Sequence, residues 1–220
     1  MTADSLPEWL RPLQELAGSV EASQLSPNFT TVPDDARPAA VLLLFSDGAD
    51  GPELLLTERS STMRNHAGQI SFPGGKSDSD DADSVHTALR EAQEEVGLDP
   101  TTVEVFGILP TLWLPPSNFA VTPVLGYWRV PSPLASTSDQ EVVTVLHHPI
   151  RQLVDPDNRF SVTHPSGWRG PAFEVGTPMP LWGFTAGIIS RLFAALGWEQ
   201  PWDDSVVRQL PELPPVIGPP

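Results

Sequence analysis

The chain of 220 residues suits one mid-sized domain with extensions, or two small ones, and its 40% hydrophobic content is enough for a buried core, which argues against wholesale disorder. Its 28 acidic and 12 basic residues leave a formal net charge of −16, which disfavours nucleic acids and anionic membranes as partners. The absence of cysteine excludes disulfides, thiolate metal sites and a cysteine nucleophile, and it fits a reducing cytoplasm.

Hydrophobic periodicity and turn residues predict a mixed sheet with few helices. The longest apolar run, residues 39–45, is far shorter than the ~20 residues of a membrane span, and no signal-peptide pattern is visible, so we expect a cytoplasmic protein. In chain order the predicted elements are a short helix within 7–16, a hairpin of 39–47 and 53–59, a strand at 70–72, a helix at 83–97, strands at 103–109, 121–130 and 141–147, a helical turn near 149–154, a hairpin of 159–164 and 171–175, and a helix over 181–196.

The composition changes at both ends of the chain. A short helix and a polar stretch precede the first long apolar run, and the chain becomes rich in proline from Glu199 onward. We therefore expect an N-terminal extension (1–36), a central domain (37–198) and a Pro-rich, poorly ordered C-terminal tail (199–220).

The predicted helix at 83–97 has two distinct faces, with Asp81 or Asp83 placed to cap its start and Gly97 just past its last turn. One face is an apolar stripe suited to the core: Val85, Leu89, Ala92 and Val96. The other face brings three carboxylates together at i, i+3 and i+4: Glu91, Glu94 and Glu95. Each like-charge i,i+4 pair costs ~0.2–0.5 kcal/mol, a penalty that a bound divalent cation removes. Taken alone, these three glutamates would also fit a solvent-exposed acidic face of the helix.

A glycine-rich loop precedes this helix. The paired glycines of Phe72-Pro73-Gly74-Gly75 let the backbone approach a ligand closely and can offer a carbonyl oxygen to a cation. Gly75 precedes Glu91 by sixteen residues, so the loop and the helix can fold back on each other. An all-oxygen ligand set of this kind selects hard metals such as Mg²⁺ or Mn²⁺.

Arg90–Leu98 resembles the second half of the Nudix box, G-x5-E-x7-R-E-U-x-E-E-x-G-U, in which U is aliphatic. The first half departs from that pattern, because Asp81 stands where the box has Glu and eight residues rather than seven separate it from Arg90. Residues 55–75 in turn resemble the signature of the coenzyme A diphosphatases, LLTxRSxxLRxHxGQVAFPGG, a subfamily that also tends to carry the lengthened box.

This resemblance implies an α/β fold, the Nudix α/β/α sandwich, with a mixed sheet between helices and the box forming a loop–helix–loop. It also implies metal-dependent hydrolysis of the diphosphate of coenzyme A, or of a derivative, to 4′-phosphopantetheine and adenosine 3′,5′-bisphosphate. The expected cofactor is Mg²⁺ or Mn²⁺ and the expected partner a small molecule of the coenzyme A type. Members of the family are often homodimers, although nothing in the sequence requires a dimer.

The site residues follow from the same motifs. Glu91 and Glu95 are the expected principal metal ligands, with Glu94 as a further ligand and the Gly75 carbonyl as a candidate. Arg90 is expected to orient a box glutamate through an ion pair, the alternative being a plain surface charge.

Candidate substrate contacts lie in the 55–75 signature. Arg59 and Arg64 are candidates for the substrate phosphates, because a guanidinium matches phosphate oxygens bidentately. His66 and Gln69 belong to the same signature. Glu141 is a candidate for an additional acid or base, and it is explained equally well as a solvated residue at the end of a strand. The general base stays open, since a box glutamate or a later acidic residue can serve.

Two other functions compete with the coenzyme A reading. One is a Nudix hydrolase of other nucleoside diphosphate derivatives, such as ADP-ribose, NADH or dNTPs, and the 55–75 signature argues against it. The other is a catalytically silent Nudix-like regulator that binds a nucleotide, and the presence of all three box glutamates argues against that.

Overall fold

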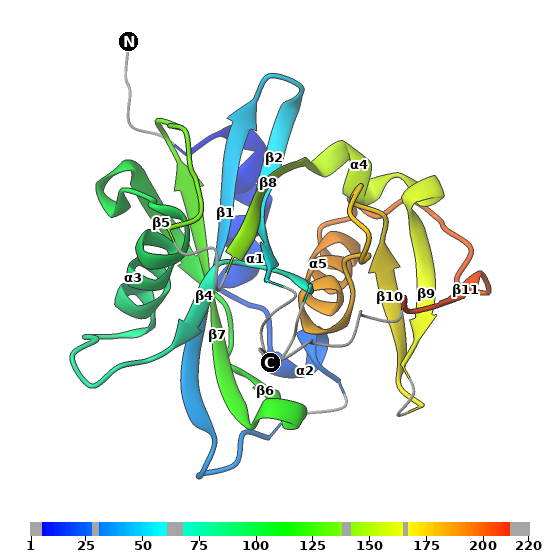
Figure 1. Ribbon diagram of the computed structural model, residues 1–220, viewed down its shortest axis with the longest axis horizontal. Coiled ribbons are helices and arrows are strands. Elements are labelled where there is room, and N and C mark those ends of the chain that lie inside the picture. Colours follow the sequence, from blue (N-terminus) through cyan, green and yellow to red (C-terminus); the bar gives the residue numbers. More distant parts are fainter. Residues whose placement is uncertain (1–5, 28–30, 61–67, 138–141, 165–166, 212–220) are drawn as a thin grey trace, which may run out of the picture.

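The computed structural model describes residues 6–27, 31–60, 68–137, 142–164 and 167–211. Within these residues, eight strands form one mixed sheet with the order β3-β2-β1-β7-β5, to which β4, β6 and β8 add at β1, β7 and β2 (Figure 1). β1 is antiparallel to β2 and parallel to β7. The strands are β1 (Arg37–Gly48), β2 (Gly51–Arg59), β3 (Ile70–Ser71), β4 (Gly74–Lys76), β5 (Val103–Ile108), β6 (Leu112–Leu114), β7 (Phe119–Trp128) and β8 (Val142–Pro149).

A smaller sheet and the helices complete the described chain. The smaller sheet has the order β10-β9-β11, built from β9 (Arg159–Thr163), β10 (Arg169–Phe173) and β11 (Val207–Gln209). The α-helices are α1 (Arg11–Ala17), α2 (Ala22–Leu25), α3 (Ser84–Val96), α4 (Ile150–Val154) and α5 (Gly183–Ala195), and short 3₁₀ turns occur at Glu8–Leu10, Pro100–Thr102, Pro115–Ser117 and Pro156–Asn158. None of the helices in the described ranges is long and apolar enough to cross a membrane.

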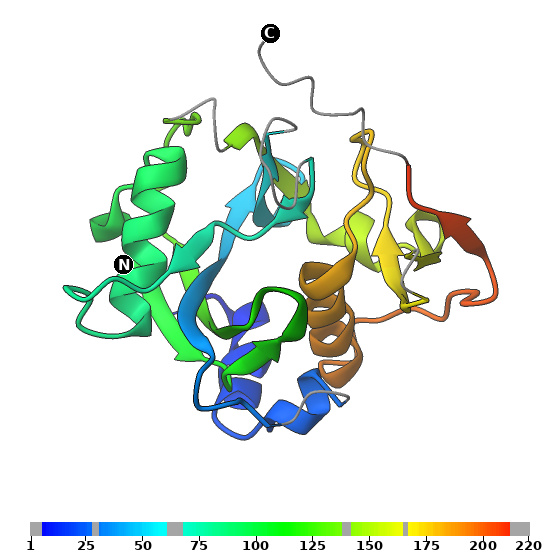
Figure 2. The same cartoon turned by 60° about the horizontal axis from the view of Figure 1, so that its bottom comes forward.

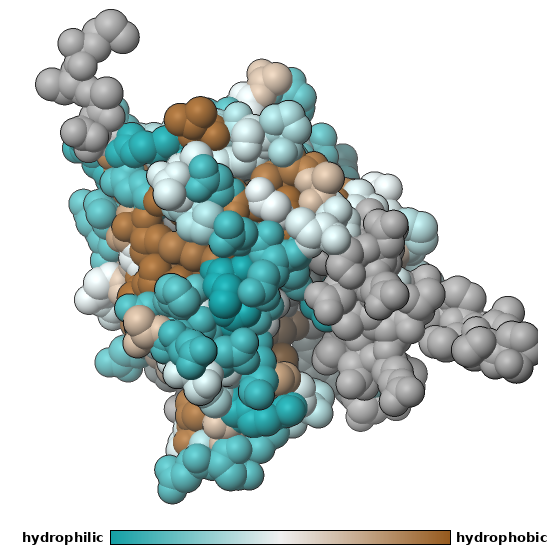
Figure 3. Space-filling view, turned by 60° about the vertical axis from the view of Figure 1, so that its left-hand side comes forward, coloured by the Kyte–Doolittle hydropathy of each residue, from teal (hydrophilic) through white to brown (hydrophobic). Residues whose placement is uncertain are grey.

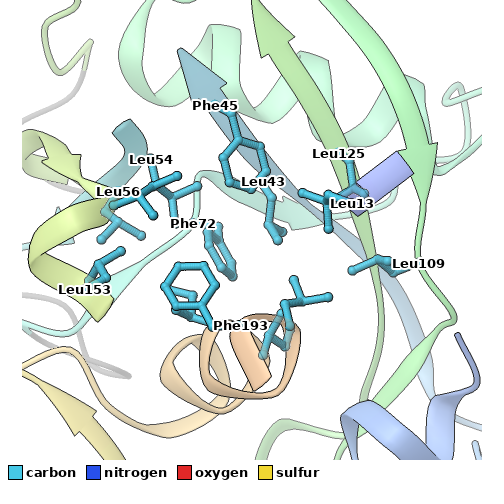
Figure 4. Close-up of a cluster of buried hydrophobic side chains, with 14 of the residues drawn as sticks. Leu13, Leu43, Phe45, Leu54, Leu56, Phe72, Leu109, Leu125, Leu153 and Phe193 are labelled. Carbon is cyan, nitrogen blue, oxygen red and sulfur yellow. The ribbon is translucent and has the colours of Figure 1, made fainter. Parts of the chain in front are cut away.

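The main sheet is covered on both faces. α3 lies on one side of it and α5 on the other, between the two sheets (Figures 1 and 2). The middle of β1 is buried on both faces of the sheet. Successive side chains point to opposite faces, so Leu42 and Leu44 belong to the cluster under α3, whereas Leu43 and Phe45 belong to the cluster under α5. Figure 4 shows Leu43 and Phe45 directed toward Phe193 of α5. This arrangement confirms the expected α/β sandwich with a mixed sheet.

The predicted helix at 83–97 is α3, and both of its ends follow the expected chemistry. Asp83, rather than Asp81, is the N-cap, since its side chain accepts a hydrogen bond of 2.8 Å from the backbone N–H of His86. Gly97 ends the helix in the left-handed region at φ 71°. Three strands were not predicted, β4, β6 and β11, because segments of three residues give no readable alternation.

The two ends of the chain pack more closely than the sequence indicated. In the expected extension, Leu10 and Leu13 are buried in the main core beneath the sheet. In the expected tail, β11 pairs in parallel with β9, and Arg159 Nη1 donates a 2.5 Å hydrogen bond to Glu199 Oε1. The prediction of poor order is therefore wrong for residues 199–211, because pairing partners distant in sequence hold this segment. Residues 212–220 lie outside the described ranges.

The burial of His148 on β8 predicts a pH-dependent contribution to stability. Its side chain is buried, and its Nε2 has no hydrogen-bond partner in the described structure. Burial lowers the pKa of His148 below the ordinary 6.5. The unfolded chain therefore takes up a proton near pH 6.5 that the folded chain resists, so the folded state loses stability as the pH falls through that value.

We expect lowering the pH from about 7.5 to about 5.5 to cost the wild type about 1 kcal/mol more unfolding free energy than the His148→Leu variant. Urea denaturation at the two pH values measures this difference. Equal losses in the two proteins would show that His148 does not set the acid sensitivity.

Candidate active site

The glycine-rich loop is held against the centre of the main sheet. Gly74 has φ +151°, and a Cβ atom there would lie 2.4 Å from the carbonyl oxygen of Ala40 and 2.6 Å from Cα of Val41. Only glycine fits so close to a neighbouring backbone. As β4, the loop pairs antiparallel with β1, which places Gly75 opposite Ala40 and leads the chain toward α3.

Glu95 is the most buried of the three box glutamates, with 5% of its side chain exposed. Its Oε2 accepts a 3.0 Å hydrogen bond from the backbone N–H of Gly74, and its Oε1 lies 3.6 Å from Nη1 of Arg59. The sequence placed Glu95 on a polar face of the helix. In the structure it follows Ala92 by three residues, at the edge of the buried face, where it meets the glycine loop.

Glu91 and Glu94 lie progressively further from the interior. Glu91 is 18% exposed, and its carboxylate sits so close to Gly75 that a Cβ there would lie 2.4 Å from Oε2. Burial raises the pKa of Glu91 above its ordinary value, and the neighbouring Arg90 opposes that shift. Glu94 is 60% exposed. On this side of the molecule hydrophilic residues cover much of the surface around smaller apolar patches (Figure 3).

Arg90 connects the glutamates to a carboxylate in the preceding loop. Its Nη1 lies 3.0 Å from Oε1 of Glu91 and 3.0 Å from Oε2 of Glu94. Its Nε and Nη2 each donate a 2.9 Å hydrogen bond to Asp81. The Arg90 guanidinium holds the pKa of Asp81 well below its usual range, and Asp81 in turn raises the pKa of Arg90. Sequence reasoning did not foresee this pair.

The oxygen atoms of the three box glutamates and of the Gly75 carbonyl are of the kind that a hard cation prefers. Other groups of the protein, however, already contact the three carboxylates. Among the described residues, no group of three or more His, Cys, Asp or Glu side chains is arranged to hold a metal ion. The reason is visible in the contacts, since Arg90 engages Glu91 and Glu94 while Arg59 and Gly74 engage Glu95. Glu91 nevertheless places its carboxylate, 18% exposed, against Gly75, and carboxylate and carbonyl oxygens are the ligands that a hard divalent cation prefers.

The 55–75 signature begins and ends beside Glu95. The Arg59 N–H donates a 3.0 Å hydrogen bond to the carbonyl of Gln69, and the Gly68 N–H donates one of 3.2 Å to the carbonyl of Arg59. The Arg59 side chain reaches Glu95, so one predicted substrate contact lies at the glutamates. Of the other three, Arg64 and His66 lie outside the described residues, whereas Gln69 lies beside Arg59, whose backbone N–H its carbonyl accepts.

Glu141 also lies outside the described residues, but the residues around it are placed. Before it, the Thr137 N–H donates a 3.1 Å hydrogen bond to the carbonyl of Glu95, at the end of α3. After it, Val142 pairs with Arg59 across β8 and β2. The described residue Thr137, before Glu141, therefore contacts the end of α3, and Val142, directly after Glu141, pairs with Arg59 in the sheet.

Comparison with known proteins agrees with this geometry. A family model described as NUDIX domain matches residues 35–161. The chain is 42% identical over 168 residues to an uncharacterized Nudix hydrolase NudL of Citrobacter koseri, covering 73% of this chain and 83% of that protein. It is 34% identical over 199 residues to the mitochondrial Nudix hydrolase 15 of Arabidopsis thaliana, covering 82% of this chain and 66% of that protein. In fold it is similar to the Nudix hydrolase RenU of M. smegmatis, with a TM-score of 0.53 and 18% identity over 76% of this chain and 90% of that one.

Proposed function

This chain belongs to the Nudix hydrolase family, and on that premise we propose that it hydrolyses the diphosphate of coenzyme A or of a coenzyme A derivative. Family membership makes it a hydrolase acting on pyrophosphate bonds, and Nudix hydrolases generally use divalent metal ions. The proposed products are 4′-phosphopantetheine and adenosine 3′,5′-bisphosphate, and the proposed metal is Mg²⁺ or Mn²⁺.

One observation supports the choice of coenzyme A over other diphosphates. The sequence from residue 55 to residue 75 resembles the coenzyme A diphosphatase signature. Both described ends of that stretch meet at the box, since Arg59 contacts Glu95 and Gly74 donates a hydrogen bond to it. Because both described ends of this stretch contact Glu95, the stretch lies next to the carboxylates, where residues that recognise the substrate are needed.

The proposed reaction assigns a task to each group at the site. Glu91 and Glu95, with Glu94 and the Gly75 carbonyl, would hold the metal, which when bound neutralises charge on the diphosphate. Arg59 carries the guanidinium suited to phosphate oxygens. A water oxygen bonds to one phosphorus, the bridging P–O bond breaks, and the water proton passes to a carboxylate. We assign that base to Glu141 on the strength of its placed neighbours, Thr137 and Val142.

The test is a substrate panel with the full-length protein and Mg²⁺ or Mn²⁺. Coenzyme A, acetyl-coenzyme A, ADP-ribose, NADH and dNTPs are incubated separately, and the products are separated chromatographically. We expect adenosine 3′,5′-bisphosphate from coenzyme A at the highest kcat/KM, and a loss of about 10²-fold or more in kcat for Glu141→Gln. Preferred cleavage of another diphosphate would overturn the substrate assignment, and unchanged kcat in Glu141→Gln would overturn the choice of base.

A further inference from the structure

A polar cleft lies between α5, the paired strands β9 and β10, and the segment 199–205. Its volume is about 700 Å³, which suits a small metabolite. Its lining includes Ser161, Arg169, Ser190, Arg191, Trp202 and Asp204. None of the described residues that line it belongs to α3 or to the 55–75 signature. Figure 1 shows α3 and the smaller sheet on opposite sides of the main sheet, so the cleft is separate from the candidate active site.

A buried cation, Arg159, lies directly behind this cleft. Its side chain is 0% exposed, and it contacts three residues of the lining. Nη1 donates a 2.5 Å hydrogen bond to Glu199, and Nη2 donates one of 2.8 Å to the Ser190 hydroxyl. Its Cζ lies 4.5 Å from the centre of the Trp202 ring, and its Nε has no hydrogen-bond partner in the described structure. Because Arg159 pairs with Glu199, that carboxylate adds no net negative charge to the cleft.

Two further arginines line the cleft without a carboxylate partner among the described residues. Arg169 donates through Nη2 to the backbone carbonyl of Asp204 and, at 3.5 Å, to the Ser161 hydroxyl. Neither acceptor is charged, so neither neutralises the guanidinium. Arg191 is exposed on α5 and makes no ion pair or side-chain hydrogen bond within the described ranges. Against these two charges stands one unpaired carboxylate of the lining, that of Asp204, so the cleft is positive in a chain whose net charge is −16.

The groups that line the cleft match an organic phosphate. A guanidinium binds phosphate oxygens through paired N–H donors, and two guanidinium groups favour the nearly two negative charges of a phosphate monoester over the single charge of a carboxylate. The Ser190 hydroxyl accepts from Arg159 and keeps its own proton for a further contact. A bare phosphate ion would leave most of the cleft empty, whereas an ester also places carbon atoms against the Trp202 indole.

We propose that this cleft is a second anion-binding site, which takes a small organic phosphate between Arg169 and Arg191, with Arg159 behind it. The site goes beyond the proposed hydrolysis and does not depend on it. Trp202 and Asp204 belong to the segment 199–211, so a ligand bound here would also hold that segment against α5 and β10.

The test follows the indole N–H signal of Trp202 by NMR in the full-length protein, with EDTA present. This N–H donates a 3.1 Å hydrogen bond to Glu199, so its signal reports on the cleft, and the spectrum of Trp202→Phe assigns it. We expect glycerol 3-phosphate to shift the signal saturably with a Kd on the order of 1 mM, and neutral glycerol to leave it unchanged. Inorganic phosphate should bind more weakly than glycerol 3-phosphate. An unmoved Trp202 signal, or equal binding of the three probes, overturns the proposal.

Arg191→Gln decides whether the arginines hold the phosphate. Arg191 makes no ion pair or hydrogen bond in the described structure, so the variant should fold, and the loss of one charge-assisted contact should weaken glycerol 3-phosphate binding by about tenfold. Arg151→Gln is the matched control, because it removes the same charge from an exposed arginine on α4 that pairs with Asp50 outside the cleft. Its Kd should stay within about twofold of the wild type. Equal weakening in the two variants would mean that the probe responds only to net charge, which contradicts a site in the cleft.

Hydrolysis provides a second readout that separates the cleft from the active site. In buffer without phosphate, Arg191→Gln should keep its kcat within about twofold of the wild type, whichever diphosphate the enzyme prefers. A larger loss would tie Arg191 to the catalytic step and overturn the assignment of a separate site. Failure of the coenzyme A assignment, with the Trp202 shifts as expected, leaves this site standing.

Discussion

Replacing Glu95 with Gln should lower kcat for diphosphate hydrolysis by about 10³-fold, equivalent to about 4 kcal/mol of transition-state stabilisation. Glu95 is the buried carboxylate of the site, placed between the Gly74 N–H and Arg59. Glutamine keeps the size and the hydrogen-bond acceptor but loses the charge that would hold a cation. The fold should therefore survive while the metal-dependent step is lost. The measurement is kcat at saturating coenzyme A and saturating Mn²⁺, with the melting temperature recorded alongside.

The matched control is Glu104→Gln on β5. Glu104 is also an ion-paired glutamate, with Arg129 as its partner, but it lies on the edge strand of the main sheet and not on α3. Its removal should leave kcat within about twofold of the wild type, as for ordinary surface changes. Activity in Glu95→Gln close to that of the control would remove Glu95 from the metal site.

Gly74→Ala should destabilise the protein by about 3 kcal/mol or more, the largest stability effect we expect from a single methyl group. The new Cβ would lie 2.4 Å from the carbonyl oxygen of Ala40 and 2.6 Å from Cα of Val41, and both atoms are backbone of the central strand. Neither atom can move without disturbing β1. Since Gly74 also donates to Glu95, activity should fall even under conditions where the variant stays folded. Urea denaturation measures the first effect and kcat the second.

Gly51→Ala separates the clash from backbone strain. Gly51 also has a positive φ, +101°, but a Cβ there would meet no atom within 4 Å. This variant carries the cost of the unfavourable backbone alone, about 1 kcal/mol. If the two alanine variants lost the same stability, the close approach of Gly74 to β1 would not be what requires glycine.

Several features could be predicted from the sequence because their causes are local. α3 appears where apolar spacing, an aspartate cap and a terminal glycine agree, and its observed bounds differ from the predicted ones by one residue at each end. Long strands such as β1 and β7 were predicted from their apolar runs. β4 could not be predicted as a strand, because its three residues pair only through contact with β1, which lies far away in the sequence.

The ends of the chain show the same limit. Residues 199–211 have a composition that favours disorder when judged locally. Arg159, buried between the rings of Phe173 and Trp202 and bonded to Glu199, gives that segment an anchor that composition does not reveal. Leu10 and Leu13 likewise look like parts of a separate short helix until the sheet that they cover is known.

By itself, the sequence determined which residues of the site share a helix and at what spacing: Glu91, Glu94 and Glu95 follow from the 3.6-residue period alone. Only the tertiary structure decided what each of them meets. The helical period sets angles between residues on one helix, but it does not set the rotation of that helix against the sheet. That rotation buries Glu95 against Gly74 and leaves Glu94 exposed. The loop before the helix then brings Asp81 to Arg90, a contact that no helical spacing contains, because one partner lies outside the helix.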